Sequence, residues 1–200
     1  MLNAEQEREH ADSSTTEAQG KRAGSWMIKE LLDWGKTIVV AIVIVIVTHL
    51  FVFNLSTVAG HSMEPTLEDG EWLYVNKFVY LMDSPKLEDV IILKSPNNSG
   101  LEQKYLVKRI VGLPGDRIEI RDHELYRNGE LVEESYIDTR IEDSDYGPII
   151  VQNGHYFVLG DNRHARASMD SRSFSAISDE LIEGRADYIL WPLDKMRSLK

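Results

Sequence analysis

The chain has 200 residues, a formal net charge of −11 and no cysteine. This length allows one ordinary domain plus a shorter segment, and the lack of cysteine excludes disulfides, Cys-based zinc sites and thiol nucleophiles. Five basic and seven acidic residues precede Thr37, and seventeen and twenty-six follow it, so the two parts carry −2 and −9. Because nucleic-acid binding requires a basic face, we expect no nucleic-acid partner. The six histidines lack metal-ligand spacing, so we expect no metal site.

The N-terminal part is predicted to hold a membrane anchor. Residues 1 to about 25 are polar and predicted to be disordered, and residues 26–36 resemble a short interfacial helix with two tryptophans suited to the headgroup layer. The 19 residues from Thr37 to Leu55 are mostly apolar, and as a helix they would span roughly 28 Å, close to the ~30 Å hydrocarbon core. A cleaved signal peptide fits less well, because the run is long and starts far from Met1. We therefore expect one retained transmembrane helix at 37–55.

The basic residues around this segment predict its orientation. The four nearest before it are Lys21, Arg22, Lys29 and Lys36, and no lysine or arginine follows it until Lys77. Because basic residues are enriched on the cytoplasmic side, we expect residues 1–36 to be cytoplasmic and residues 56–200 to form an extracytoplasmic domain. The sequence thus predicts a single-pass protein of the cell membrane.

Beyond the anchor the pattern is typical of β-structure. The turn Leu113–Asp116 and the hairpin signal Asn128–Gly129 separate short apolar or alternating segments. The acidic stretch 133–148 is predicted to be a loop, and Ser178–Gly184 is the helix candidate of this domain. Strands are predicted at 72–75, 90–93, 105–111, 118–120, 125–126, 131–132, 156–159 and 188–191. The predicted fold class is mainly β, with strongly bent antiparallel sheets.

The first candidate for chemistry is Ser62, in a turn between Gly60 and Pro65. The glycine would let the backbone approach a substrate and leave its N–H free as a donor, while the proline stiffens the exit. This turn is not the G-x-S-x-G elbow, because Glu64 occupies the position of the second glycine, and the S-x-x-K motif is absent as well. By itself, a serine in such a turn is more often only a turn residue.

Lys108 gives that serine a potential base. Strand alternation places Lys108 between Leu106 and Ile110 on one face, with Arg109 pointing the other way. An edge-strand lysine that extends to water is the commoner alternative. If Lys108 is buried, desolvation lowers its pKa, and a neutral lysine can take the proton from Ser62.

A third segment adds polar groups. Gly160 to Arg163 follows a predicted strand, and Ser168, Asp170 and Arg172 alternate, so we expect these three on one strand face. A hydroxyl beside a neutral lysine would orient the amine, and an Asp/Arg pair would brace the loop. Taken alone, this segment resembles an ordinary polar loop.

Together, these segments resemble the type I signal peptidases, the membrane-anchored Ser–Lys endopeptidases that remove leader peptides from exported proteins. The similarity runs from Trp34 to the C-terminus. It includes a nucleophile box at 62–67, a middle box at 70–80, a lysine box at 105–116 and a final box at 160–172. The lysine at 108 resembles the bacterial type, since the endoplasmic-reticulum type has histidine there. The single anchor and the short outer domain resemble the Gram-positive form.

The resemblance implies a Ser–Lys peptidase domain that cuts after small-x-small sites such as Ala-x-Ala. It implies Ser62 as nucleophile, Lys108 as general base, and signal peptides and the lipid bilayer as partners, with no metal or cofactor. Ser168 would hydrogen-bond the lysine, and the Ser62 N–H and the Gly60 region would stabilise the oxyanion. The supporting residues implied are Gly60, Ser168, Asp170, Arg172, Asp161 and Arg109.

Two positions depart from the family pattern. Gly60 stands where some relatives have a serine, and the four residues 164–167 separate Arg163 from Ser168, where the family usually has two. Two other functions are compatible with parts of the pattern. A self-cleaving repressor-type protease would share the Ser–Lys dyad, but the anchor and the lack of a DNA-binding helical domain argue against it. An inactive, membrane-anchored leader-binding protein would not need both Ser62 and Lys108.

Overall fold

The computed structural model describes residues 30–46, 53–96 and 105–199. The chain divides into two compact units, residues 1–48 and 49–200. In the first unit, residues 30–46 form one helix, which continues across the predicted boundary at residue 36 between interfacial helix and membrane span. Within the described ranges, none of the helices has both the length and the apolar character needed to cross a membrane.

The predicted segments of this N-terminal part lie only partly within the described residues. Residues 1–29, including the polar segment predicted to be disordered, and residues 47–52 of the predicted span lie outside them. At the end of the predicted span the structure differs from the prediction, because Leu55 belongs to strand β1 (Phe53–Thr57). Its backbone pairs with the next strand of a sheet, so the apolar run continues past the helix into β-structure.

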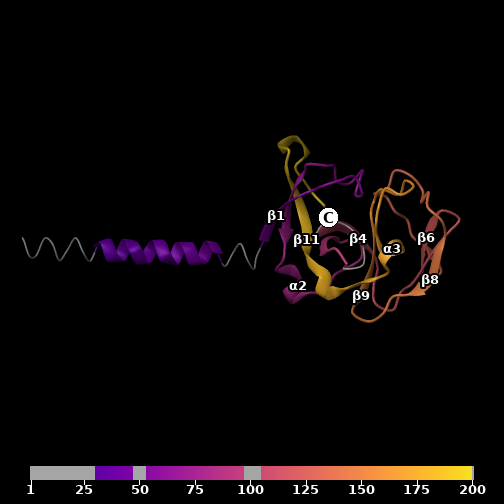
Figure 1. Cartoon of the computed structure of the whole chain (residues 1–200), viewed down its shortest axis with the longest axis horizontal. Coiled ribbons are helices and arrows are strands. Elements are labelled where there is room, and N and C mark those ends of the chain that lie inside the picture. Colours follow the sequence, from indigo (N-terminus) through magenta and orange to yellow (C-terminus); the bar gives the residue numbers. More distant parts are fainter. Residues whose placement is uncertain (1–29, 47–52, 97–104, 200) are drawn as a thin grey trace, which may run out of the picture. The chain divides into compact units, whose positions relative to one another are not determined.

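The second unit is built mainly on one large antiparallel sheet, as the sequence predicted (Figure 1). The strand order is β1-β2-β11-β3-β4-β9-β10, with β12 paired to β11. Register shifts interrupt β11 against both of its neighbours and β4 against β9, which are the irregularities that bend a sheet. The strands are β2 (Trp72–Asn76), β3 (Val90–Lys94), β4 (Tyr105–Gly112), β9 (His155–Leu159), β10 (Ile177–Ser178), β11 (Ile182–Trp191) and β12 (Arg197–Ser198).

A smaller antiparallel sheet of four strands lies at the other end of this unit from β1 and β11 (Figure 1). Its order is β7-β6-β5-β8, from β5 (Arg117–Arg121), β6 (Glu124–Arg127), β7 (Glu130–Leu131) and β8 (Tyr146–Ile150). Asn128 and Gly129 join β6 to β7 with φ of 58° and 88°, which confirms the predicted hairpin. The acidic stretch is irregular up to residue 145, and its last three predicted loop residues belong to β8.

Helices are short in this unit: α2 (Val79–Met82), α3 (Ser171–Phe174) and the 3₁₀ turns Asp179–Leu181 and Leu193–Lys195. The predicted helix at 178–184 is wrong. Ser178 does cap a turn, by accepting a hydrogen bond from the Glu180 N–H, but the turn is a single 3₁₀ turn and Ile182 already begins β11. Caps of this kind start either type of turn, and here pairing with β3 draws the next residues into a strand.

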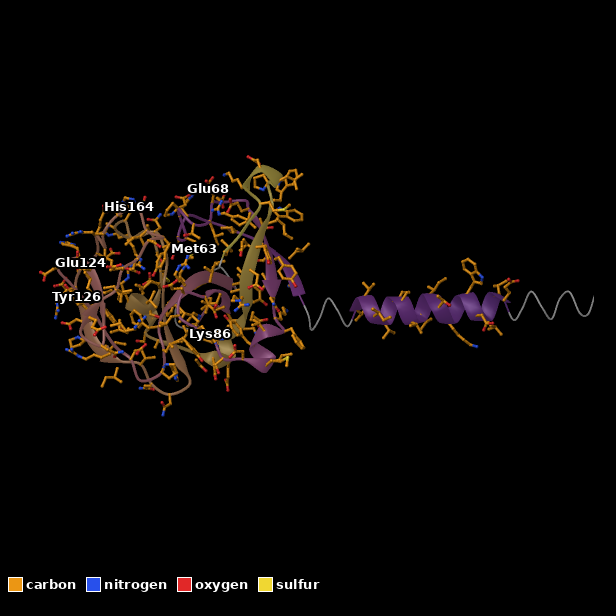
Figure 2. All side chains as sticks on the ribbon, turned by 180° about the vertical axis from the view of Figure 1, so that it is seen from behind. Met63, Glu68, Lys86, Glu124, Tyr126 and His164 are labelled. Carbon is orange, nitrogen blue, oxygen red and sulfur yellow. The ribbon has the colours of Figure 1, made fainter. Side chains whose placement is uncertain are left out.

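Three clusters of buried apolar side chains stabilise the unit. One fills the space under β2 and β11 and includes Met63 and Leu67, which come from the segment after β1. A second joins the smaller sheet to β4 and β9 of the large one, and a third lies against β3, β4 and β9. Figure 2 shows Met63 within the body of the unit and Glu68 at its edge. The first cluster therefore fixes the segment that carries Ser62.

Candidate active site

Ser62 lies in a tight turn that is anchored in the core by the nearby side chains of Met63 and Leu67. The Leu67 N–H donates to the Met63 carbonyl over 2.9 Å, and the two side chains are 0% and 1% exposed. Gly60 enters the turn with φ of 95°, which favours glycine. Burial of two apolar side chains thus holds the turn and leaves the Ser62 hydroxyl at its surface.

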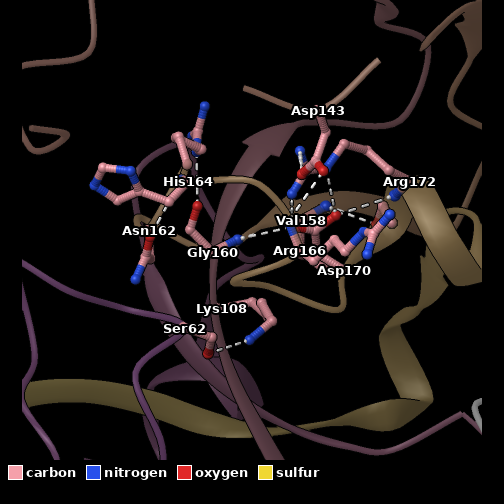
Figure 3. A network of polar contacts seen from close by, with 12 residues as sticks. Ser62, Lys108, Asp143, Val158, Gly160, Asn162, His164, Arg166, Asp170 and Arg172 are labelled. Carbon is pink, nitrogen blue, oxygen red and sulfur yellow. Dashed lines mark hydrogen bonds and ion pairs between the residues drawn. The ribbon is translucent and has the colours of Figure 1, made fainter. Parts of the chain in front are cut away.

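Lys108 approaches that hydroxyl from strand β4. Its Nζ lies 2.7 Å from Ser62 Oγ and 2.8 Å from the carbonyl oxygen of Val107, and the residue is 1% exposed (Figure 3). Burial lowers the pKa of Lys108 to about 8; the carboxylates of Asp170 and Asp161 oppose this shift, and the Arg172 guanidinium adds to it. Lys108 is therefore buried, which excludes the alternative of an edge-strand lysine that extends to water.

Of the two backbone N–H groups expected to stabilise an oxyanion, those of Gly60 and Ser62, only one is available. The Gly60 N–H donates to Asp69 Oδ1 over 2.7 Å, so the expectation that it is free was wrong. The Ser62 N–H has no acceptor among the described residues, which leaves it available to a developing oxyanion. Sequence reasoning missed Asp69, although its place in an Asp-Gly turn was a signal for a side chain that accepts from backbone N–H groups.

Gly160 brings the final segment against the dyad. A Cβ built at Gly160 would lie 2.3 Å from the Ser62 carbonyl oxygen and 2.3 Å from Ser168 Oγ, so this position has room only for glycine. Ser168 is 9% exposed, and its hydroxyl has no hydrogen-bond partner among the described residues. The implied Ser168–Lys108 hydrogen bond is therefore not formed, because the lysine amine donates to Ser62 Oγ and the Val107 carbonyl instead.

Asn162 holds the turn that carries Ser62, a contact that sequence reasoning missed. Its side-chain amide donates to the His61 carbonyl over 2.9 Å, and its backbone N–H donates to the Ser62 carbonyl over 3.2 Å. The two bonds fix the peptide groups before and after Ser62, and the first of these contains the Ser62 N–H. An asparagine directly after Gly160-Asp161 was visible in the sequence, but its partners lie about 100 residues away.

Arg109 and Asp161 form a buried bidentate pair beside the lysine. The guanidinium donates to the two carboxylate oxygens over 2.9 and 2.6 Å, and its Cζ lies 4.0 Å from the ring centroid of Tyr136. Arg109 does alternate away from Lys108, but it points into a buried pair and not toward water. A third bond, to the Glu88 carbonyl over 2.9 Å, satisfies another of its donors.

Asp170 and Arg172 form the second buried pair, with two bonds of 2.8 Å. The expectation that they share a strand face with Ser168 is wrong, because Asp170 is the N-cap of α3 and accepts from the Arg172 N–H. Asp170 also accepts from the Gly160 N–H over 3.3 Å. The pair therefore braces the segment around Gly160, although not in the predicted conformation.

A third buried pair comes from the acidic stretch that was predicted to be a plain loop. Glu134 accepts from both terminal nitrogens of Arg163 over 2.9 and 2.6 Å, and the side chains are 4% and 0% exposed. Arg163 also donates to the Gly160 carbonyl over 2.7 Å. The local sequence contains no signal for this pair, because the two partners are 29 residues apart.

A small cavity of about 60 Å³ lies beside the dyad. It is lined by Ser62 and Lys108 and by the backbone and apolar side chains that lead into them, which are residues 56–60, Met63, Ile92 and 105–107. Its volume suits a small aliphatic group. Among the described residues no group of three or more histidine, cysteine, aspartate or glutamate side chains is arranged to hold a metal ion.

Comparison with known proteins places this site in a family. The model of the signal peptidases, peptidase S26, matches residues 31–191. Signal peptidase I P of Bacillus subtilis subsp. natto is 38% identical over 180 residues, covering 85% of this chain and 94% of that protein. Signal peptidase I T of Bacillus subtilis is 34% identical and covers 96% of this chain and 99% of that protein.

A similar relative comes from a genus other than Bacillus. Signal peptidase IB of Staphylococcus aureus is 33% identical over 188 residues, covering 86% of this chain and 95% of that protein. These relatives come from Bacillus and Staphylococcus, so the expected resemblance to the Gram-positive form is confirmed. This chain belongs to the signal peptidase family S26 and is a Gram-positive-like type I signal peptidase, a serine endopeptidase.

Proposed function

We propose that this enzyme removes N-terminal signal peptides from exported preproteins with Ser62 as nucleophile and Lys108 as general base. The observation that carries the proposal is the 2.7 Å contact between Ser62 Oγ and the Nζ of a lysine that is 1% exposed. A lysine with a pKa of about 8 is neutral in an appreciable fraction of molecules near neutral pH, and only the neutral amine can accept a proton.

The chemistry follows the order of an acyl-enzyme mechanism. Neutral Lys108 accepts the Ser62 proton as Oγ attacks the scissile carbonyl, and the Ser62 N–H stabilises the resulting oxyanion. The ammonium then gives its proton to the leaving amine, which is the N-terminus of the mature protein. A water molecule, deprotonated by the same lysine, attacks the ester and releases the signal peptide. Each proton taken up is returned, so Lys108 is neutral at the end of the cycle.

The cavity beside the dyad supports a preference for small residues before the cut. A volume of about 60 Å³ accepts a methyl group and excludes large side chains, and forcing bulk into a packed site costs more than losing a methylene. We propose cleavage after small-x-small sequences. Large residues directly before the cut should suppress cleavage, while the middle position should tolerate them.

We also propose that the enzyme is anchored by one membrane span within 37–55, with residues 1–36 in the cytoplasm and residues 56–200 outside. The apolar run and the four nearest basic residues before it support this arrangement. Protease added to intact protoplasts should digest the domain after residue 55 and leave residues 1–36 protected. Protection of the C-terminal domain would reverse the orientation.

The experiment that tests the chemistry is cleavage of a synthetic leader peptide ending in Ala-x-Ala by the full-length protein in detergent. Ser62→Ala and Lys108→Met should each lower the rate by about 10³-fold or more, and the double variant should be no slower than either, because the two residues act as a unit. Lys108→Met keeps the volume and removes a buried amine, so its melting temperature should not fall. Near-normal cleavage by Lys108→Met would refute the proposed base.

A further inference from the structure

The residues that the family pattern did not predict, 164–167, are held by the acidic stretch of the chain. The Glu142 N–H donates to the Arg163 carbonyl over 3.0 Å, and the Glu142 carboxylate accepts from the Ala165 N–H over 2.9 Å. The same carboxylate lies 3.2 Å from His164 Nδ1. Asp143 accepts from the Arg166 N–H over 3.1 Å (Figure 3). Two consecutive acidic residues thus fix the course of four consecutive residues of the neighbouring segment.

This contact continues directly to the nucleophile turn. The His164 N–H donates to Asn162 Oδ1 over 3.2 Å. The other end of the same side chain, its amide nitrogen, donates to the His61 carbonyl over 2.9 Å. The 164–167 segment therefore orients the Asn162 side chain through its amide oxygen. The amide nitrogen of the same side chain in turn holds the peptide group before Ser62.

A second path starts at Asp143 and reaches the same place. Its other carboxylate oxygen accepts from Arg172 Nη1 over 2.9 Å, and Arg172 is paired with Asp170. Asp170 accepts from the Gly160 N–H over 3.3 Å, and Gly160 lies against the Ser62 carbonyl. Both acidic residues therefore connect to the peptide groups that flank the nucleophile, by separate contacts.

We propose that Glu142, Asp143 and residues 164–167 form a latch that positions Asn162 and Gly160 against the Ser62 turn. Glu142 and Asp143 are positioning residues, since neither touches the reacting atoms. The inference rests on the proposed function, because it concerns the alignment of the same Ser62. The backbone hydrogen bond from Ala165, together with the contact from His164, lowers the pKa of Glu142, so the latch favours the ionised carboxylate.

The latch should affect turnover more than substrate binding. It contacts the Ser62 turn through Asn162 and Gly160, while the cavity beside the dyad is lined by none of its residues. A shift of about 1 Å in a nucleophile can cost on the order of 10²-fold in rate. Loosening a latch two contacts away should therefore lower kcat by about tenfold and change KM by less than about twofold.

The experiment compares Glu142→Ala and Asp143→Ala with the control Asp145→Ala in the full-length protein. Asp145 is exposed, lies in the same acidic stretch, and makes no side-chain hydrogen bond or ion pair within the described part of the chain, so its loss changes charge alone. On the leader peptide, both latch variants should lose about tenfold in kcat, and the control should match the wild type. Glu142→Gln, which keeps an acceptor for the Ala165 N–H, should recover most of the loss.

Two further measurements separate positioning from general stability. His164→Ala and the Glu142→Ala/His164→Ala double variant should show non-additive losses, because both residues act through the same contact. Latch variants with the same kcat as Asp145→Ala would overturn the proposal. It would also be overturned if the latch variants had lower melting temperatures and regained the kcat of the wild type when assayed at lower temperature. An inactive wild type, or an active Ser62→Ala, would instead refute the proposed function itself.

Discussion

The turn that carries Ser62 and the segment 160–172 meet at Gly160 but are stabilised by different interactions. The turn is anchored by two apolar side chains, Met63 and Leu67, that are almost completely buried. The other segment is anchored by three buried ion pairs, those of Asp161, Arg163 and Asp170. An apolar anchor loses only its own packing when it is truncated, whereas a broken ion pair leaves the remaining charge buried without its partner.

The comparison also explains why the pKa of the lysine in this site is lowered while the pKa values of Arg109 and Arg172 are raised. Arg109 and Arg172 each have a carboxylate within hydrogen-bond distance, at 2.6 and 2.8 Å. The acceptors of Lys108 are a hydroxyl and a carbonyl, and no carboxylate of the described chain forms an ion pair with it. Burial of Lys108 is therefore not balanced by a direct partner, and its pKa falls to about 8.

The largest effect is expected where the two regions touch. Gly160→Ala places a Cβ 2.3 Å from the backbone oxygen of Ser62, so the turn and the segment must separate. We expect cleavage to fall by about 100-fold or more, because the nucleophile moves relative to Lys108. The leader-peptide assay, with circular dichroism as the check on folding, measures this. A rate near that of the wild type would show that the contact relaxes without moving Ser62.

Breaking an ion pair in the segment should have the next largest effect. Asp161→Ala leaves Arg109 buried without its carboxylate, which should lower the free energy of unfolding by about 3–5 kcal/mol. Urea denaturation of the full-length protein in detergent measures the change. The double variant Arg109→Met/Asp161→Leu should recover much of the loss, since a buried pair is often replaceable by apolar side chains. A double variant as unstable as Asp161→Ala would contradict this explanation.

Truncating the apolar anchor should be slightly less costly. Met63→Ala removes a side chain that is 1% exposed, and we expect a loss of about 2–5 kcal/mol. Met63→Leu nearly conserves volume and should cost less than about 1.5 kcal/mol. The same urea titration compares the two variants. If Met63→Leu were as unstable as Met63→Ala, packing volume would not be what anchors the turn.

Local signals in the sequence indicated Ser62 and Lys108 as candidates, and the resemblance to a known family joined them into one pair. Gly60 and Pro65 around Ser62, and the alternation around Lys108, each lie within a few residues. The contacts of Asn162 and Glu134 could not be predicted in this way, because their partners lie 101 and 29 residues away and any polar side chain in those loops gives the same local pattern.

Some conformations were also beyond local signals. Ser168, Asp170 and Arg172 alternate as in a strand, but the capping bond of Asp170 starts a short helix there. At 178–184 the capping residue was predicted correctly, but the predicted helix was too long. It ends after one turn because the next residues pair with β3 as a strand. Local patterns therefore indicated the residues of the site better than the backbone that carries them.

The pH dependence of cleavage tests the lysine that lies between the two regions. The base must be neutral, so kcat/KM should rise about tenfold per pH unit below about 8 and level off above it. Because the carboxylate of Asp161 raises the pKa of Lys108, Asp161→Asn should move this limb to lower pH. Initial rates between about pH 6 and 10 measure both. A flat profile over that range would exclude Lys108 as the base.

The smallest effect is expected from removing an exposed ion pair at the end of the turn that carries Ser62. Lys195 Nζ lies 2.5 Å from Glu68 Oε2, at the end of that turn, but the side chains are 35% and 55% exposed. An exposed pair gains little over its interactions with water and is screened by salt, so Lys195→Ala should leave cleavage and urea unfolding at their wild-type values.

This result would sharpen the comparison, because Lys195→Ala and Asp161→Ala each remove one partner of an ion pair. A loss for Lys195→Ala as large as that for Met63→Ala would mean that the turn depends on its charged rim more than on Met63 and Leu67. If Lys195→Ala is neutral and Asp161→Ala is not, burial decides what an ion pair contributes in this enzyme. The packing of Met63 and Leu67 would then be unaffected by ionic strength, because neither side chain carries a charge.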